Sequence, residues 1–231
     1  MRVVLIHGSG GNAETAWASL RPLAERYTLV APNRGGYPPN PPVERIDFEQ
    51  QADELAPLLE DGAHLVGHSY GGVIALLLAA RRPEAVRSLA VSEPPAFGLA
   101  RGHAAVEALV TKLDAHFTSG PRDPREFSAG FLAHVGSSAQ VPGELSPKVE
   151  QSVRATMAER PPWEAKIPLD DLAAAPFRKL VFSGAHHPAF EAVCDVLEQR
   201  LGAERAVLPG AGHGLPRAPG YLERLEAFLS S

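Results

Sequence analysis

The stretch Gly67-His68-Ser69-Tyr70-Gly71 decides the fold, because its flanks predict a strand that turns sharply into a helix. Ala63–Gly67 is a short apolar run typical of a buried strand, and Tyr70–Arg82 has the length and apolar character of a buried helix. Between such elements, the pattern G-x-S-x-G is typical of a tight turn that presents a nucleophilic serine. Glycines two residues before and two after the serine avoid collisions with neighbouring elements. Ser69 is therefore the candidate nucleophile; the alternative is a tight turn that contains a serine by chance.

Working outward from this turn, short apolar runs alternate with longer helical patterns, which is typical of a parallel sheet with crossover helices. We expect strands at Val3–His7, Thr28–Ala31, Ala63–Gly67, Val86–Val91, Leu180–Ser183 and Arg205–Leu208. We expect helices at Glu14–Arg26, Phe48–Glu60, Tyr70–Arg82, Pro188–Leu201 and Pro219–Leu229. The chain of 231 residues, 45% of them hydrophobic, is long enough for one domain with its own core.

One long segment interrupts the alternation. Between Pro94 and Pro176 there is no convincing strand, and three short amphipathic helices are predicted at Ala104–Phe117, Pro124–Val135 and Pro147–Glu159. A connection of this length either forms a subdomain or covers a site. Because α/β sheets bind ligands at the ends of their strands, we expect residues 95–175 to form a helical cap there, over a core made of 1–94 and 176–231.

The glycine-rich run His7-Gly8-Ser9-Gly10-Gly11 follows the first strand. It lacks the third glycine and the later acid of a dinucleotide fingerprint, and the Lys-Ser/Thr of a phosphate-binding loop. We therefore predict that it contributes to an oxyanion hole, in which the backbone N–H groups of Ser9 and of Tyr70 point at the developing negative charge.

The run Gly210-Ala211-Gly212-His213-Gly214 follows the last strand. A histidine in such a loop can approach the serine from a neighbouring strand end, accept its proton and return that proton to a leaving group. His213 is the predicted general base, and the alternative is a surface histidine.

These three loops occur in the chain order of the α/β-hydrolase superfamily, which the sequence resembles over essentially its whole length. Asn33-Arg34-Gly35-Gly36 also resembles the family's loop after the second strand. The resemblance implies a minimal, mostly parallel six-stranded sheet flanked by helices, with a helical cap inserted between strands. The resemblance identifies neither a subfamily nor a substrate.

The sequence departs from the family at the triad acid, because His187 occupies the position where the family usually has Asp. An imidazole cannot supply the anionic acceptor that orients the base. Some relatives carry the acid one strand earlier, where this chain has Glu93, so we predict Glu93 as the acid. Glu191 is a weaker candidate, and a Ser–His dyad or a degenerate site also remains open.

Composition argues against several other classes. The net charge of −5 gives no basic face for nucleic acid or an anionic membrane. The longest apolar run is too short to span a bilayer, and no secretory signal is evident, so we expect a cytoplasmic protein. Cys194 is the only cysteine and fits a helix core. Adjacent His186 and His187 have no partners at metal-ligand spacing, and we expect neither metal nor cofactor.

The expected function is hydrolysis of a small ester or related acyl compound through an acyl-enzyme on Ser69. Phe97 and Trp163 are the predicted substrate-binding residues, although such aromatic side chains also pack cap helices. Two alternatives stay open: a cofactor-free lyase or perhydrolase using the same residues, and a non-catalytic protein that binds a small ligand. The expected partner is a small-molecule substrate, and the sequence indicates no oligomeric state.

Overall fold

The computed structural model describes residues 1–60 and 62–230, and shows a six-stranded sheet in the order β2-β1-β3-β4-β5-β6. Every neighbouring pair is parallel. The strands are β1 (Arg2–Ile6), β2 (Thr28–Val30), β3 (Ala63–His68), β4 (Val86–Ser92), β5 (Arg178–Ser183) and β6 (Glu204–Val207). This arrangement confirms the predicted fold class; Ser231, the last residue of the predicted core, lies outside the described residues.

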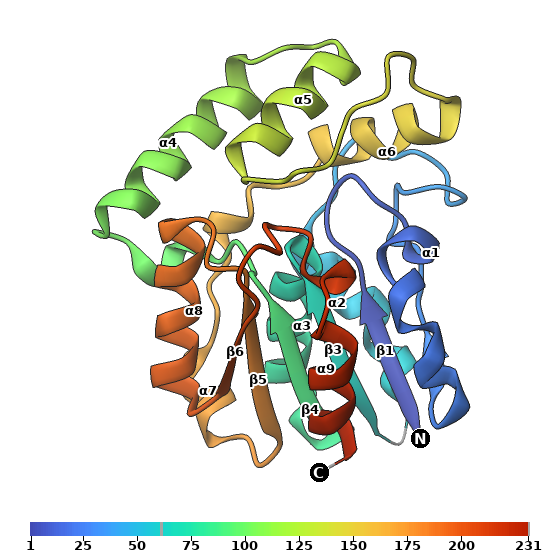
Figure 1. Ribbon diagram of the computed structural model, residues 1–231, viewed down its shortest axis with the longest axis vertical. Coiled ribbons are helices and arrows are strands. Elements are labelled where there is room, and N and C mark those ends of the chain that lie inside the picture. The colour runs from blue at the N-terminus through green and yellow to red at the C-terminus, as the bar shows by residue number, and fades with distance from the viewer. Residues whose placement is uncertain (61, 231) are drawn as a thin grey trace.

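Helices cover both faces of the sheet (Figure 1). One face carries α2 (Phe48–Leu55), α3 (Tyr70–Arg81), α7 (Leu169–Ala174) and α8 (Pro188–Leu201). The other carries α1 (Ala13–Ala16), the 3₁₀ helix η1 (Ala18–Glu25) and α9 (Tyr221–Ser230). Each face therefore buries its own apolar layer, as a parallel sheet requires.

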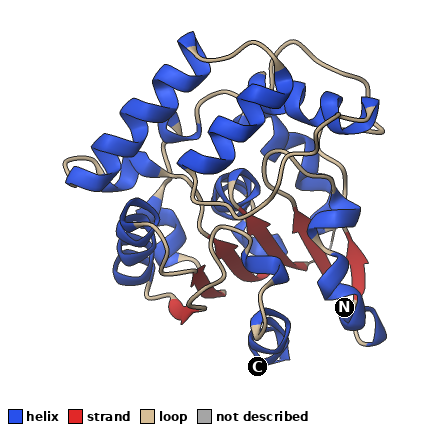
Figure 2. Cartoon of the chain, turned by 45° about the horizontal axis from the view of Figure 1, so that its top comes forward, coloured by secondary structure: helices blue, strands red, loops and turns tan. Residues whose placement is uncertain are grey.

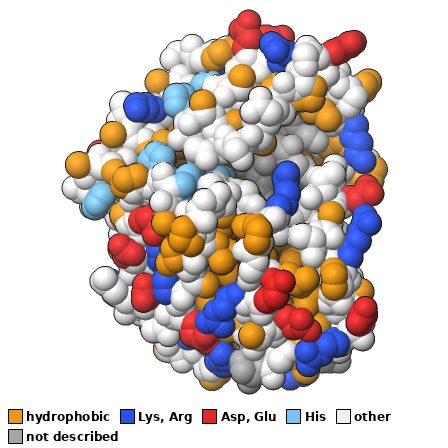
Figure 3. Space-filling view, viewed as in Figure 1, with side chains coloured by type: hydrophobic (Ala, Val, Ile, Leu, Met, Phe, Trp, Pro, Cys, Tyr) orange, Lys and Arg blue, Asp and Glu red, His pale blue; other side chains and the backbone are white. Residues whose placement is uncertain are grey.

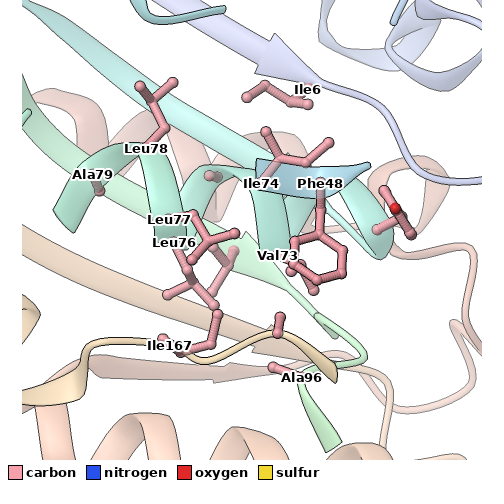
Figure 4. Packing of buried hydrophobic residues seen from close by; sticks show 14 of the residues in the cluster. Ile6, Phe48, Val73, Ile74, Leu76, Leu77, Leu78, Ala79, Ala96 and Ile167 are labelled. Atoms are coloured by element: carbon pink, nitrogen blue, oxygen red, sulfur yellow. The ribbon is translucent and has the colours of Figure 1, made fainter. Parts of the chain in front are cut away.

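Helix α3 lies at the centre of the larger layer and is buried along nearly its whole length. Its residues Val73 and Ile74 lie near Phe48 of α2, and Leu76 lies near Ile167 (Figure 4). Because α3 follows Ser69 directly, this packing fixes the position of the turn that carries the candidate nucleophile.

The segment between β4 and β5 forms three longer helices over the carboxyl ends of the strands (Figures 1 and 2). They are α4 (Ala104–Ser119), α5 (Pro124–His134) and α6 (Pro147–Met157). Asp123 and Ser146 cap α5 and α6 by accepting hydrogen bonds from backbone N–H groups of the first turn. We refer to residues 95–175 as the cap.

Two predicted helices were wrong in form. In place of a helix over Glu14–Arg26, the chain makes one α-turn and then η1, because the buried residues Trp17, Leu20 and Leu23 are spaced by three, which places them on one face of a 3₁₀ helix. The helix predicted over Phe48–Glu60 ends at Leu55 and continues as the 3₁₀ helix η2 (Ala56–Leu59), which contains Pro57.

Helix α7 and the short 3₁₀ helices η4 (Phe97–Ala100) and η5 (Pro162–Glu164) have no counterpart among the elements predicted from the sequence. Each is six residues or fewer, too short for a periodic pattern to stand out.

Among the described residues, no helix combines the length and the apolar character needed to cross a membrane.

The close approach of β1 to the turn after β3 predicts that Gly71→Ala destabilises the protein by about 1–3 kcal/mol or more. A Cβ at this position would stand 2.2 Å from the backbone oxygen of Ile6 and 2.6 Å from that of His7, neither of which can move without disturbing the sheet. Urea denaturation measures the change in the free energy of unfolding.

Gly143→Ala is the matched control, because a Cβ at Gly143 meets no atom within 4 Å. Equal stability of the two variants would contradict this account of the packing.

Candidate functional site

Four loops that follow parallel strands meet at one edge of the sheet. Ile6 pairs with Gly67, and His68 pairs with Ser92, so the residues that follow β1, β3 and β4 stand side by side. The loop after β6 completes the group and carries His213. The topology thus brings together side chains that are more than 100 residues apart in the chain.

Ser69 occupies the turn between β3 and α3 with φ of 53° and ψ of −125°, a backbone conformation that non-glycine residues rarely adopt. The strain is held by the packing of α3 and by the hydrogen bond from Ser69 N to the backbone oxygen of Ser92 (2.9 Å). The side chain is almost fully buried beneath the cap. Gly8 faces it closely, since a Cβ there would stand 2.9 Å from Ser69 Cβ.

His213 connects this serine to a carboxylate. Its Nε2 lies 2.9 Å from Ser69 Oγ, and its Nδ1 lies 2.8 Å from Glu93 Oε2. The imidazole is buried and packs against the ring of Phe190, with ring centroids 4.6 Å apart. A proton on Nδ1 is therefore held by Glu93, which leaves Nε2 free to accept the hydroxyl proton of Ser69.

Glu93 follows β4 directly, has φ of 41° and is fully buried. Its second oxygen, Oε1, accepts a hydrogen bond from the backbone N–H of Gly184 (2.7 Å) and lies 3.2 Å from His186 Nδ1. Burial alone would raise the pKa of this carboxyl, but His186, His213 and the Gly184 N–H outweigh it and lower the pKa to about 2. Glu93 is therefore ionised at neutral pH.

The two other positions considered for the acid have different roles. His187 is the N-cap of α8, and its Nδ1 accepts a hydrogen bond from the backbone N–H of Ala189 (3.1 Å). Glu191 contacts Arg205 at 2.6 Å and accepts a hydrogen bond from Ser183 Oγ at 3.1 Å. Neither side chain contacts His213.

The contact between His186 and Glu93 was not predicted from the sequence. Its Nε2 lies 3.1 Å from the backbone oxygen of Val135 in the cap, and its Nδ1 faces Glu93, so both ring nitrogens face oxygens that cannot donate. Burial alone would lower the pKa of His186, but the Glu93 carboxylate outweighs it and raises the pKa. The histidine pair was visible in the sequence, but no local pattern links it to Glu93.

Glu93, His186 and His213 also have the composition of a metal-binding group, with one ligand atom from each within 4.8 Å of the others. The hydrogen bonds of Glu93 and His213 already account for this proximity, and His213 Nε2 is directed at Ser69. These ligand atoms are therefore already engaged with one another and with Ser69.

The glycine-rich loop after β1 reaches Ser69, since Ser9 and Ser69 line the same two cavities, one of which Tyr70 also lines. Neither the backbone N–H of Ser9 nor that of Tyr70 has an acceptor among the described residues. His7 shapes the loop: its Nδ1 donates to Gly8 O (2.8 Å), and its Nε2 accepts from the backbone N–H of Arg34 (3.1 Å). Burial, followed by the charge of Arg34, lowers the pKa of His7 to about 3, which keeps the ring neutral for both bonds.

A buried carboxylate from the cap holds this loop. Glu159 accepts hydrogen bonds from Ser9 Oγ (2.5 Å), Tyr37 OH (2.7 Å) and Arg34 Nη2 (2.5 Å), and the Arg34–Glu159 pair is shielded from solvent. Thr156, one turn earlier in α6, accepts a hydrogen bond from the backbone N–H of Gly10 (2.9 Å). The cap and the loop that faces Ser69 are thus joined by charged hydrogen bonds, which are stronger than neutral ones.

Two cavities flank Ser69. The inner cavity has a volume of about 20 Å³ and is lined by aromatic residues that include both predicted substrate-binding residues, Phe97 and Trp163. Phe97 is fully buried and packs on Phe190, with ring centroids 5.2 Å apart, whereas Trp163 is half-buried. The outer cavity has a volume of about 220 Å³ and extends between the cap and the loops after β1 and β6.

A model of the alpha/beta hydrolase family matches residues 3–225 of this sequence. The chain belongs to the alpha/beta hydrolase family. The hydrolase from Rhodococcus sp. described as 2-hydroxy-6-oxo-6-phenylhexa-2,4-dienoate hydrolase has a similar fold: the TM-score is 0.65 with 22% identity, and the match covers 100% of this chain and 90% of that one.

Two relatives match parts of this alpha/beta hydrolase. The dihydrolipoyllysine-residue acetyltransferase component of the acetoin cleaving system of Cupriavidus necator is 35% identical over 114 residues, which are 47% of this chain and 30% of the relative. The pimeloyl-[acyl-carrier protein] methyl ester esterase of Chromobacterium violaceum is 34% identical over 122 residues, which are 50% of this chain and 48% of the relative. The matched part is less than half the length of either relative.

The bond between Ser9 and Glu159 predicts that Ser9→Ala loosens the loop after β1 and lowers kcat for p-nitrophenyl acetate by about tenfold or more. Loss of a whole oxyanion-hole donor costs about 10²–10³ in kcat, which is the upper guide. The variant keeps the Arg34–Glu159 pair, so the protein stays folded and loses about 1.5–3 kcal/mol of stability. Steady-state kinetics and urea denaturation measure the two effects.

Ser119→Ala, on an exposed serine of α4 far along the cap, is the control for the substitution itself. A Ser9→Ala variant with the wild-type kcat would contradict a positioning role for this bond.

Proposed function

We propose that this alpha/beta hydrolase is a serine esterase that cleaves small esters through an acyl-enzyme on Ser69. The observation that carries the proposal is the continuous chain of hydrogen bonds from Ser69 Oγ through His213 to the ionised Glu93. A serine whose proton can pass to a buried, oriented imidazole is the arrangement that nucleophilic acyl transfer requires.

In the first half of the reaction, Ser69 Oγ attacks the acyl carbon and gives its proton to His213 Nε2. Glu93 stabilises the imidazolium that forms. The backbone N–H groups of Ser9 and Tyr70 bind the oxygen that becomes negative, with additional support from the N-terminus of α3. The bond to the alcohol then breaks, and the proton on Nε2 passes to the leaving alcohol.

In the second half, water enters the site in place of the alcohol. His213 Nε2 takes a proton from the water as its oxygen attacks the acyl carbon, and returns that proton to Ser69 Oγ as the ester bond to the enzyme breaks. The products are the free acid and the restored enzyme. Water is the only co-reactant, because His213 passes on each proton that it accepts within the same half-reaction.

The relatives support an acyl-transfer reaction of this kind, because one is named as an esterase and the other as an acetyltransferase component. The motive for a non-catalytic ligand-binding protein was the histidine at position 187. That reason is weaker because the carboxylate of Glu93, at the end of a neighbouring strand, contacts His213 Nδ1 instead. A cofactor-free lyase or perhydrolase would use the same residues, and no observation favours either over the esterase.

The proposal predicts that Ser69→Ala lowers kcat for p-nitrophenyl acetate by up to about 10⁶, the loss seen when a triad nucleophile is removed from a well-studied serine protease. The same variant should lose labelling by a fluorophosphonate probe, because the probe reacts only with an activated serine. Steady-state kinetics, and mass spectrometry of the labelled protein, measure the two effects.

Circular dichroism shows whether the variant is folded, and Ser119→Ala serves as the control for both assays. A folded Ser69→Ala variant that keeps most of its esterase activity would exclude this mechanism.

A further inference from the structure

The two cavities at Ser69 differ in size and in chemistry, and the residues that line both are Ser9, Ser69, Phe131 and Val135. Both contact Ser69 and Ser9, but only the outer cavity contacts His213. On the face drawn in Figure 3, the surface is hollowed between the cap and the loops of the core. An ester bound at Ser69 must place its acyl group and its alcohol on different sides.

The position of His213 decides which side takes the alcohol. The proton on His213 Nε2 has to reach the oxygen of the leaving alcohol, so that oxygen must come within hydrogen-bond distance of the ring. The alcohol therefore occupies the outer cavity, which His213 lines, and the acyl group occupies the inner cavity, which lies on the side of Tyr70 and Phe190.

The inner cavity admits only a short acyl group. A volume of about 20 Å³ holds roughly one small group such as a methyl. Its wall includes aromatic rings that pack on one another, with centroids 6.0 Å apart for Phe117 and Phe131 and 6.2 Å apart for Phe117 and Trp163. An acetyl group fits this space, whereas a longer chain would have to displace the rings.

The outer cavity is larger and mostly apolar on its cap side, where Leu132, Val141, Leu145 and Val153 contribute to the wall. Among the described residues that line it there is no Asp, Glu or Lys, and Arg217 is the single arginine. Arg217 is exposed and makes no ion pair with any described residue. Burial chiefly lowers the pKa of the neighbouring His68 ring, and the charge of Arg217 adds a small part. An unpaired guanidinium at the edge of an apolar cavity favours a ligand that ends in an anion.

We propose that the substrates are esters of a short acyl group, of acetyl size, with a larger apolar alcohol that carries a carboxylate bound by Arg217. A single arginine presents one planar fork, which matches one carboxylate, whereas a phosphate dianion calls for more positive charge than this cavity supplies. This inference rests on the proposed esterase function and adds to it the class of acyl group and alcohol.

The first test compares two substrates with the same phenolic leaving group: the acetate ester of para-hydroxyphenylpropanoate, and the acetate ester of the corresponding amide. The two esters differ in charge, but their phenolic leaving groups have almost the same reactivity. Wild-type protein should show a kcat/KM for the carboxylate about tenfold or more above that for the amide, which is the effect of one charged hydrogen-bonded pair.

Arg217→Gln should bring the ratio of the two kcat/KM values close to one, and Arg217→Lys should restore part of it. Arg87→Gln, an exposed arginine at the start of β4, is the matched control and should keep the wild-type ratio. Because each variant is judged by a ratio, a change in its overall activity does not affect the conclusion.

The second test varies the acyl group with p-nitrophenyl acetate, butanoate and hexanoate. Wild-type kcat/KM should fall by about tenfold or more from acetate to hexanoate, and Trp163→Ala should narrow that difference by opening the inner cavity.

A wild-type enzyme that hydrolyses esters through Ser69 but shows no preference for the carboxylate, or that prefers hexanoate, would overturn this inference and leave the esterase function standing. Absence of hydrolysis of every ester by folded wild-type protein would overturn both.

Discussion

The hydrogen bond between the Glu93 carboxylate and His213 Nδ1 is the interaction on which the site depends. A buried carboxylate is costly unless it is paired and hydrogen-bonded. Glu93 is stabilised from three sides, by the rings of His213 and His186 and by the N–H of Gly184, which keeps it ionised although it has no contact with solvent. That charge holds the proton on Nδ1, and it therefore determines that Nε2 is the nitrogen that faces Ser69 unprotonated.

The fold makes this interaction possible by aligning the ends of parallel strands. Ser69, Glu93 and Ala185 follow β3, β4 and β5, and all three have positive φ without being glycine. Strained residues of this kind persist only where the surrounding structure holds them, and they concentrate at functional sites. The cap adds two further contacts. The backbone oxygen of Val135 contacts His186, which lies beside Glu93, and Glu159 accepts a hydrogen bond from Ser9 in the loop after β1. Removing the cap would therefore disturb the geometry at both ends of the hydrogen-bonded chain as well as expose the site to water.

Features encoded by local pattern could be predicted from the sequence. The parallel sheet followed from the alternation of short apolar runs with helices, and Ser69 and His213 followed from glycine-rich turns after predicted strands. Glu93 followed only from the resemblance to relatives that carry the acid one strand earlier. Contacts between distant segments left no such signal: Ser9 and Glu159 are 150 positions apart, and the pattern predicted Glu159 only as the last residue of a cap helix, which ends at Met157. Arg34 was noticed as part of a family-like loop, but its pairing with a carboxylate from the cap depends on tertiary structure alone. The 3₁₀ helix η1 was misjudged because apolar residues spaced by three also fit one face of an α-helix.

The most direct test of the account is the effect of Glu93→Gln on kcat for p-nitrophenyl acetate, compared with the effect of His187→Asn. The amide keeps the shape of the side chain and removes its charge, so kcat should fall by as much as about 10⁴, the loss found for the equivalent change in another serine hydrolase, while the protein stays folded. His187→Asn, at the position where the family usually has its acid, should leave kcat close to the wild-type value, because asparagine also caps a helix well. A folded Glu93→Gln variant with the wild-type kcat, or a large loss of activity in His187→Asn alone, would contradict the assignment of Glu93 as the acid.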